Sequence, residues 1–217
     1  MLHCRAVRSD TELLDAWAAG DQEAGRAFYG RFADRVTRFF ARKLHAEVAD
    51  LVQRTFLKCL EARRGGAEVG NAAAMLFAVA RNELYDAFRA RRRAAARFDP
   101  DVTSLEELAG AGTGASTAVA RHEQQRLLLA ALRRIPLDDQ LALELYYWEE
   151  LPMADVARVL GTSKSGAINR VHRARGLVRD ALEALETTPA IRNDTVEGFE
   201  TWARSLRAGE GGEGSAP

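Results

Sequence analysis

The sequence predicts an all-α protein made of two small helical domains joined by a flexible linker. Every periodic segment repeats its apolar residues with the spacing of a helix, and none alternates apolar with polar residues as a strand does. A stretch rich in Gly, Ser, Thr and acidic residues separates two such helical blocks. We therefore predict a first domain over residues 9–97, an acidic flexible linker over 98–117 and a second domain over 118–186. A partly disordered extension is expected over 187–217.

The first domain is expected to be a bundle of four helices. Ser9 and Glu12 have the spacing of a capping box at the start of a short helix, and Asp21 can cap the second helix. A third helix is expected over about residues 46–64, and Asn71 can cap a fourth. Each helix has one apolar face, so the four together can enclose a core. The apolar stripe of the second helix consists of Ala24, Phe28, Phe32, Val36 and Phe40.

The second domain contains a pattern typical of a DNA-reading helix-turn-helix. Helices are expected over about residues 117–134, 137–149 and 153–160, and a last helix begins after Ser163. Gly161 can adopt the left-handed conformation that the sharp turn needs, and Ser163 can cap the last helix. A helix presented in this way fits the major groove of B-DNA, where its N-terminal half reaches the base edges.

Successive residues of the last helix are 100° apart, so its apolar residues turn inward and its polar residues outward. Asparagine is suited to adenine, and arginine and lysine are suited to guanine or phosphate. His172 is expected at the surface, near phosphate or solvent. The alternative is an ordinary helical hairpin with a solvated basic face. The expected DNA-contacting residues are Lys164, Ser165, Asn169, Arg170 and Arg173.

The charge distribution agrees with contacts to a polyanion at two places. The formal net charge is zero, from 31 basic and 31 acidic residues. Residues 81–97 nevertheless hold six arginines against two acidic residues, and residues 164–180 hold five basic residues against one acidic residue. Acidic residues gather between and after these segments. Two basic segments separated by an acidic one suggest two separate contacts with nucleic acid.

Composition narrows the class of protein. With 47% hydrophobic and 29% charged residues the chain suits a globular protein rather than general disorder. No apolar run is long enough to cross a bilayer, and the N-terminus lacks the apolar core of a signal peptide, so we expect a cytoplasmic protein without membrane contact. Cys4 and Cys59 have neither disulfide nor zinc-site spacing. We expect reduced thiols, no metal and no cofactor.

Three blocks in register resemble the extracytoplasmic-function (ECF) group of bacterial sigma factors. They are DLVQRTFLKCLEAR (residues 50–63), AMLFAVARNELYDAFRARRR (residues 74–93) and the helix-turn-helix block of residues 132–178. The resemblance implies that the first domain is like sigma region 2 and the second like region 4, which reads the −35 promoter element. It also places contact with core RNA polymerase on Asp50, Gln53 and the edge of Phe56. Core packing is the alternative for Phe56.

The second block resembles the helix that melts and reads the −10 promoter element. An Asn82 amide can read an extruded base edge, while Arg81 and Arg89 can hold phosphates. The resemblance makes the loop of residues 65–71, with Asn71 at its end, the rim of a pocket for a flipped base. Unstacking a base costs a few kcal/mol, so such a pocket must supply comparable contacts.

Two positions depart from the family pattern, and one segment lies beyond it. Met75 stands where members usually have tryptophan, which weakens aromatic support for melting. Ile168 stands where lysine is frequent; we expect it to lie toward the domain body, in contact with a thymine methyl group or with nothing. The extension has a narrow apolar stripe that either docks on a domain or stays mobile. This stripe comprises Val196, Phe199, Trp202 and Leu206.

The resulting prediction is a sigma factor that binds core polymerase and promoter DNA and is not itself an enzyme. An anti-sigma factor or another regulator is an expected partner. One alternative is a stand-alone helix-turn-helix regulator, which would leave DLVQRTF without a purpose. Another is a recombinase-like enzyme, for which Tyr85 near Arg81 and Arg89 is the only candidate nucleophile.

Overall fold

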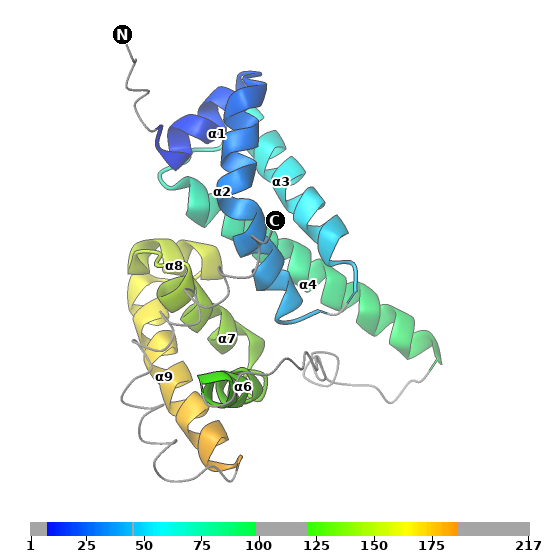
Figure 1. Cartoon of the computed structure of the whole chain (residues 1–217), viewed down its shortest axis with the longest axis vertical. Coiled ribbons are helices and arrows are strands. Elements are labelled where there is room, and N and C mark those ends of the chain that lie inside the picture. Colours follow the sequence, from blue (N-terminus) through cyan, green and yellow to red (C-terminus); the bar gives the residue numbers. More distant parts are fainter. Residues whose placement is uncertain (1–7, 45, 99–120, 186–217) are drawn as a thin grey trace. The chain divides into compact units, whose positions relative to one another are not determined.

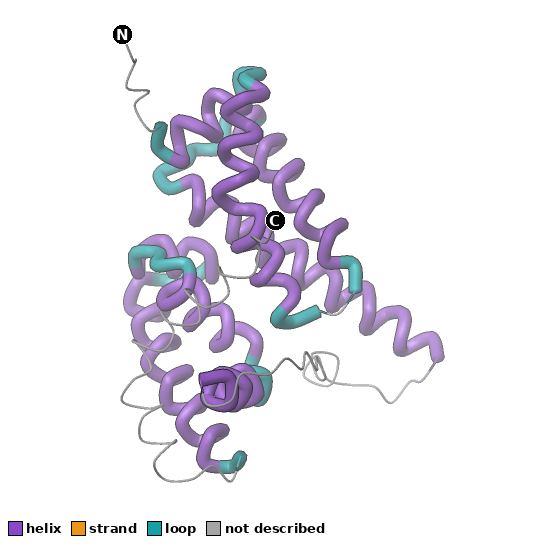
Figure 2. The backbone as a smooth tube through the Cα atoms, in the orientation of Figure 1, coloured by secondary structure: helices purple, strands orange, loops and turns teal. Residues whose placement is uncertain are grey.

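The computed structural model of the chain describes residues 8–44, 46–98 and 121–185. The predictions for the linker and for the C-terminal extension lie outside these residues, except that residue 98 still belongs to a helix. All regular elements of the described residues are helical, which confirms the predicted all-α class (Figures 1 and 2). The chain divides into two compact units, Met1–Leu108 and Ala109–Pro217.

The first unit contains the four predicted helices, which are α1 (Asp10–Ala18), α2 (Gln22–Ala41), α3 (Val48–Arg64) and α4 (Ala72–Phe98). The capping box is confirmed, because the Glu12 amide donates to Ser9 Oγ and the Ser9 amide donates to the Glu12 carboxylate. The Asp21 carboxylate accepts from the amides of residues 23 and 24 at 3.0 Å. Hydrogen bonds lower the pKa of both carboxyl groups. The main cause is the hydrogen bond from the Ser9 backbone for Glu12 and the hydrogen bond from the Arg8 side chain for Asp21.

Aromatic side chains fill the core of the first unit. The predicted stripe of α2 is buried throughout, and Phe39, which the stripe did not include, is buried as well. The phenyl ring of Phe28 lies 4.9 Å from that of Phe32 and 6.1 Å from that of Phe56, so α2 and α3 share one aromatic cluster. In Figure 1 α2, α3 and α4 are long helices that run beside one another.

The second unit contains α6 (Arg121–Leu132), α7 (Leu137–Leu143), α8 (Met153–Leu160) and α9 (Lys164–Glu183). The sequence predicted one helix over 137–149. The structure instead continues α7 as a π-helical turn, η1 (Glu144–Trp148), which Glu150 closes with a φ of +50°. Helix α9 packs against α6, α7 and α8, so it is the central support of this unit.

Candidate polymerase and nucleic-acid interfaces

Helices α8 and α9 form the predicted helix-turn-helix. Helix α8 covers the expected residues, and Gly161 follows it in the left-handed conformation, with φ 66° and ψ 36°. Ser163 Oγ accepts from the Gly166 amide at 3.0 Å and caps α9. The left-handed conformation of Gly161 and the Ser163 cap together set the angle at which α9 leaves the turn.

One face of α9 is buried and the opposite face is exposed. Ala167, Val171, Ala174 and Val178 are buried in the unit. Lys164, Ser165, Asn169 and His172 are exposed, as the sequence predicted. Ile168 was expected to lie toward the domain body, and that expectation was wrong because its side chain is 47% exposed. Ile168 lies about one and a half turns from the Ser163 cap, at the edge between the buried stripe and the exposed face.

Two arginines of α9 have acidic partners that sequence reasoning missed. Arg170 lies 2.8 Å from Asp138, and Arg173 donates from one Nη2 to both oxygens of Asp139, at 2.7 and 2.9 Å. The Asp139 side chain has no exposed surface, whereas the Arg173 side chain remains 61% exposed. These two arginines therefore brace α9 against the start of α7. The sequence feature that could have indicated this brace is the adjacent acidic pair, Asp138 and Asp139, in the first turn of α7.

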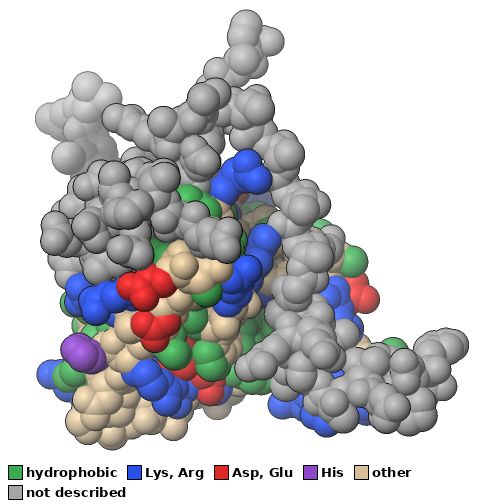
Figure 3. Space-filling view, turned by 90° about the horizontal axis from the view of Figure 1, so that it is seen from below, with side chains coloured by type: hydrophobic (Ala, Val, Ile, Leu, Met, Phe, Trp, Pro, Cys, Tyr) green, Lys and Arg blue, Asp and Glu red, His purple; other side chains and the backbone are tan. Residues whose placement is uncertain are grey.

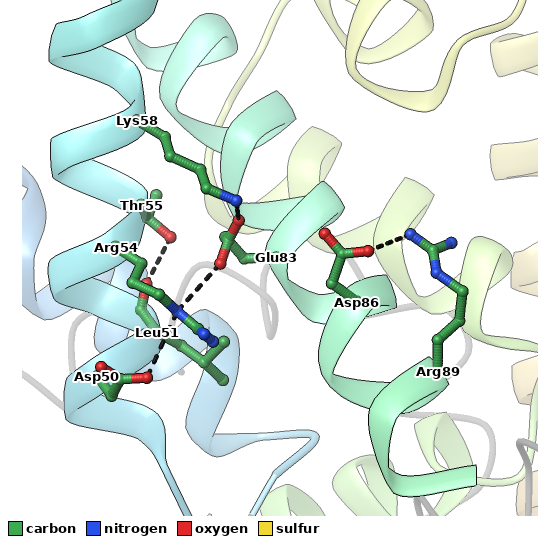
Figure 4. Close-up of polar contacts among 8 residues, drawn as sticks. All are labelled: Asp50, Leu51, Arg54, Thr55, Lys58, Glu83, Asp86 and Arg89. Atoms are coloured by element: carbon green, nitrogen blue, oxygen red, sulfur yellow. Dashed lines mark hydrogen bonds and ion pairs between the residues drawn. The ribbon is translucent and has the colours of Figure 1, made fainter. Parts of the chain in front are cut away.

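A second charged cluster joins α3 to α4 (Figure 4). Glu83 of α4 is buried, with 3% of its side chain exposed, and lies against Lys58 and, at 3.2 Å, Arg54 of α3. Arg54 also lies 3.4 Å from Asp50. Sequence reasoning did not single out Glu83. The sequence feature that could have indicated this cluster is an acidic residue beside the apolar stripe of α4.

The proposed polymerase-contacting residues divide into two exposed and one buried. Asp50 and Gln53 are exposed on α3. Phe56 is 3% exposed, and its ring lies 4.7 Å from that of Tyr29 and 6.1 Å from that of Phe28. The structure therefore favours the packing alternative for Phe56. Tyr29 and Leu57, which the sequence did not single out, are exposed on α2 and α3.

The four residues expected at the −10 element have different surroundings along α4. Asn71 Oδ1 accepts from the Ala74 amide at 3.2 Å, so this side chain caps the helix. The Arg81 guanidinium lies 4.8 Å from the centre of the Tyr85 ring. Arg89 forms an ion pair with Asp86, farther along the helix than the Glu83 cluster (Figure 4). The Asn82 side chain is exposed.

The remaining surface and buried groups offer little chemistry of their own. On the face shown in Figure 3 the lysine and arginine side chains stand in separate groups, with acidic and hydrophobic side chains between them. Burial raises the pKa of the Cys59 thiol to about 12, so it is not a nucleophile near neutral pH. Within the described residues no cluster of His, Cys, Asp or Glu could hold a metal ion. None of the described helices has the length and apolar character to span a membrane.

Comparison with known families identifies both units. The Sigma-70 region 2 model matches residues 28–94, and the Sigma-70 region 4 model matches residues 125–186, so together they cover more than half of the chain. The chain belongs to the sigma-70 family. Region 2 falls on α2, α3 and α4, and region 4 falls on the unit that contains the helix-turn-helix. Members of this family are transcription initiation factors and not enzymes.

Individual relatives agree with the ECF group. Over 170 residues the chain is 29% identical to the ECF RNA polymerase sigma factor BldN of Streptomyces coelicolor. This match covers 75% of the chain, which spans only 62% of the length of that relative. Two solved structures share the fold, each with a TM-score of 0.57. CnrH, in complex with the cytosolic domain of CnrY, is 23% identical, with 81% of this chain and 99% of that chain covered. The sigma factor RpoE, in complex with the anti-sigma factor NepR from Bartonella quintana, is 24% identical, with 73% and 98% covered.

Proposed function

We propose that this ECF-type sigma factor binds core RNA polymerase in the cytoplasm and directs it to specific promoters. The observation that carries the proposal is the presence, on one chain and in the family order, of a region 2 bundle and a region 4 helix-turn-helix. The polymerase supplies the chemistry of RNA synthesis. A stand-alone regulator needs only the second of these units, so the bundle argues for the sigma function.

Core polymerase docks on the outer face of α3 in this proposal. Asp50 and Gln53 are exposed one turn apart, and the Arg54–Glu83 contact ties the same stretch of helix to α4. The docking face is therefore held by a rigid two-helix support rather than by a loop. Replacing both residues, Asp50→Ala with Gln53→Ala, should weaken binding to core polymerase at least tenfold without changing helical content.

A matched control is available on α2. Asp34 and Thr37 are also exposed and three residues apart, and replacing both by alanine likewise removes one acidic and one uncharged polar side chain. Binding of both double variants to purified core polymerase is measured by fluorescence anisotropy, with circular dichroism as the folding check. Equal affinities for the Asp50/Gln53 variant, the Asp34/Thr37 variant and the parent would disprove docking through α3.

Reading of the −10 element is assigned to the outer side of α4. Asn82 is exposed and carries both a donor and an acceptor for a base edge. The Arg81 guanidinium over Tyr85 presents a cationic surface to phosphate or to a stacked base. Arg89 reaches phosphate only if its contact with Asp86 is exchanged, so we expect Asp86→Ala to strengthen single-stranded DNA binding. Asn71 supports the site as a helix cap.

A protein regulator is part of the proposal. Two proteins that share this fold, CnrH and RpoE, were solved with protein partners, and the partner of RpoE is an anti-sigma factor. We propose that this chain likewise has a protein antagonist that covers its polymerase-binding face. Such an antagonist should compete with core polymerase for the chain, and simultaneous binding of both in a sizing experiment would contradict this.

A further inference from the structure

The outward face of α9 carries four side chains that adjoin one another. Ile168 and Asn169 are consecutive, and each lies three or four residues from both Ser165 and His172, so the four side chains adjoin one another on the helix. All four are exposed, with Ile168 at the edge nearest the buried stripe of Ala167, Val171, Ala174 and Val178. This face is the one that a DNA groove would meet first.

The brace to α7 fixes which face of α9 points outward. Arg173 neutralises Asp139, whose side chain is wholly buried, and Arg170 pairs with Asp138. Turning the Arg173 side chain away from α7 toward a base would leave the Asp139 carboxylate buried without its counterion, which is strongly unfavourable. Arg170 and Arg173 are therefore held to α7, whereas the uncharged Ser165, Ile168 and Asn169 take no part in this brace.

Ile168 is the apolar member of this face. A single exposed apolar side chain is common on protein surfaces, so its exposure alone carries no argument. Its position does, because it lies between Ser165 and Asn169 in the half of the helix that reaches base edges. Its side chain can neither donate nor accept a hydrogen bond. In the major groove the apolar group displayed by the base pairs is the C5-methyl group of thymine.

We infer that Ile168 contacts a thymine methyl group in the promoter element that α9 reads, and thereby helps to determine promoter sequence. This inference rests on the proposed function of the chain as a promoter-reading sigma factor. It makes Ile168 a specificity-determining residue, and it reduces the base-reading role that the sequence suggested for Arg170 and Arg173.

The test removes only the methyl group. Holoenzyme is assembled from the full chain and core polymerase, a promoter is found by selection, and each thymine of the upstream element is replaced in turn by uracil. Wild-type holoenzyme should lose about fourfold in affinity at one thymine, as expected when one methyl group, worth about 0.8 kcal/mol, is no longer buried. Ile168→Ala should bind the thymine promoter about as weakly and should not distinguish uracil from thymine there.

Two variants serve as controls. Ile168→Val keeps a β-branched apolar side chain and should retain most of the uracil effect. Glu183→Ala changes an exposed residue at the far end of α9, about 22 Å along the helix from Ile168, and should keep the whole effect. Circular dichroism checks that all variants fold.

The outcomes separate the inference from the function on which it rests. If wild-type holoenzyme selects a promoter but is indifferent to uracil at every thymine, or if Ile168→Ala keeps the same uracil penalty, the contact does not exist although the sigma function stands. If the holoenzyme selects no sequence, the proposed function fails and the inference fails with it.

Discussion

Replacing Arg173 by alanine tests whether the α7–α9 brace holds the recognition helix. The substitution leaves Asp139, which has no exposed side-chain surface, without the guanidinium that now contacts both of its oxygens at 2.7 and 2.9 Å. An uncompensated charge in the interior is what makes breaking a buried pair costly. Arg170→Ala provides the comparison, since its partner Asp138 is 38% exposed and can be solvated once the arginine is gone.

The magnitude follows from burial. Removing one partner of a fully buried pair costs about 3–5 kcal/mol, whereas an exposed pair contributes about 0.2–1 kcal/mol. The Arg173 side chain is 61% exposed, so water reaches one side of the pair and reduces the loss. We therefore expect Arg173→Ala to lower the free energy of unfolding of the second unit by about 2 kcal/mol and Arg170→Ala by about 0.5 kcal/mol.

Urea unfolding followed by Trp148 fluorescence measures both losses. Trp148 is 4% exposed in the second unit, and replacing Trp17 and Trp202 by phenylalanine makes it the only reporter. Adding Asp139→Asn to Arg173→Ala removes the buried charge, so the double variant should recover about 1 kcal/mol relative to Arg173→Ala alone. The reasoning is refuted if Arg173→Ala costs no more than Arg170→Ala, or if Asp139→Asn gives no recovery.

Three further predictions follow from the same structure. Replacing Arg54 and Lys58 together by alanine should lower the free energy of unfolding by about 2 kcal/mol, because the buried Glu83 carboxylate is left without a counterion. Glu83→Gln should lower it by about 1 kcal/mol or less, because both cations can turn to solvent. Urea titrations that give the reverse order would contradict this. Gly161→Ala should cost about 1 kcal/mol, measured by thermal unfolding, because φ is +66° there. In a Cys4→Ser background, Cys59 should react with a thiol reagent much more slowly in the folded chain than in urea at every pH between 7 and 9, because burial keeps its thiolate fraction low. Its folded pKa, about 12, is the higher one, so its contribution to stability is present below about pH 8.5 and is lost as pH rises toward that folded value.

Local signals in the sequence were enough to predict the helix-turn-helix. Gly161 and Ser163 act within a few residues of their own positions, and the bounds of α8 depend on them and on its apolar periodicity. The same holds for the caps of α1 and α2. Each of these features needs only one helix end and a short stretch of chain, so no knowledge of the packing was required.

The polar contacts between helices could not be predicted in the same way. Whether Arg173 faces DNA or Asp139 depends on the angle between α7 and α9, and residues 34 positions apart give no periodic signal. Glu83 and Arg54 pose the same problem between α3 and α4. The exposure of Ile168 was missed for a related reason: the residue lies at the border of the buried stripe, where the packing of neighbouring helices decides whether a side chain is covered.

Transcription from purified components tests the central claim most directly. Core RNA polymerase from the source organism is given genomic DNA with and without the full chain, and the 5′ ends of the products are sequenced. The account predicts new start sites that share one upstream and one downstream element, appear only with the chain, and disappear with the Asp50→Ala, Gln53→Ala variant while the Asp34→Ala, Thr37→Ala variant retains them. Absence of any new start site, together with sequence-specific binding of the chain alone to DNA, would contradict the sigma function and favour a stand-alone regulator.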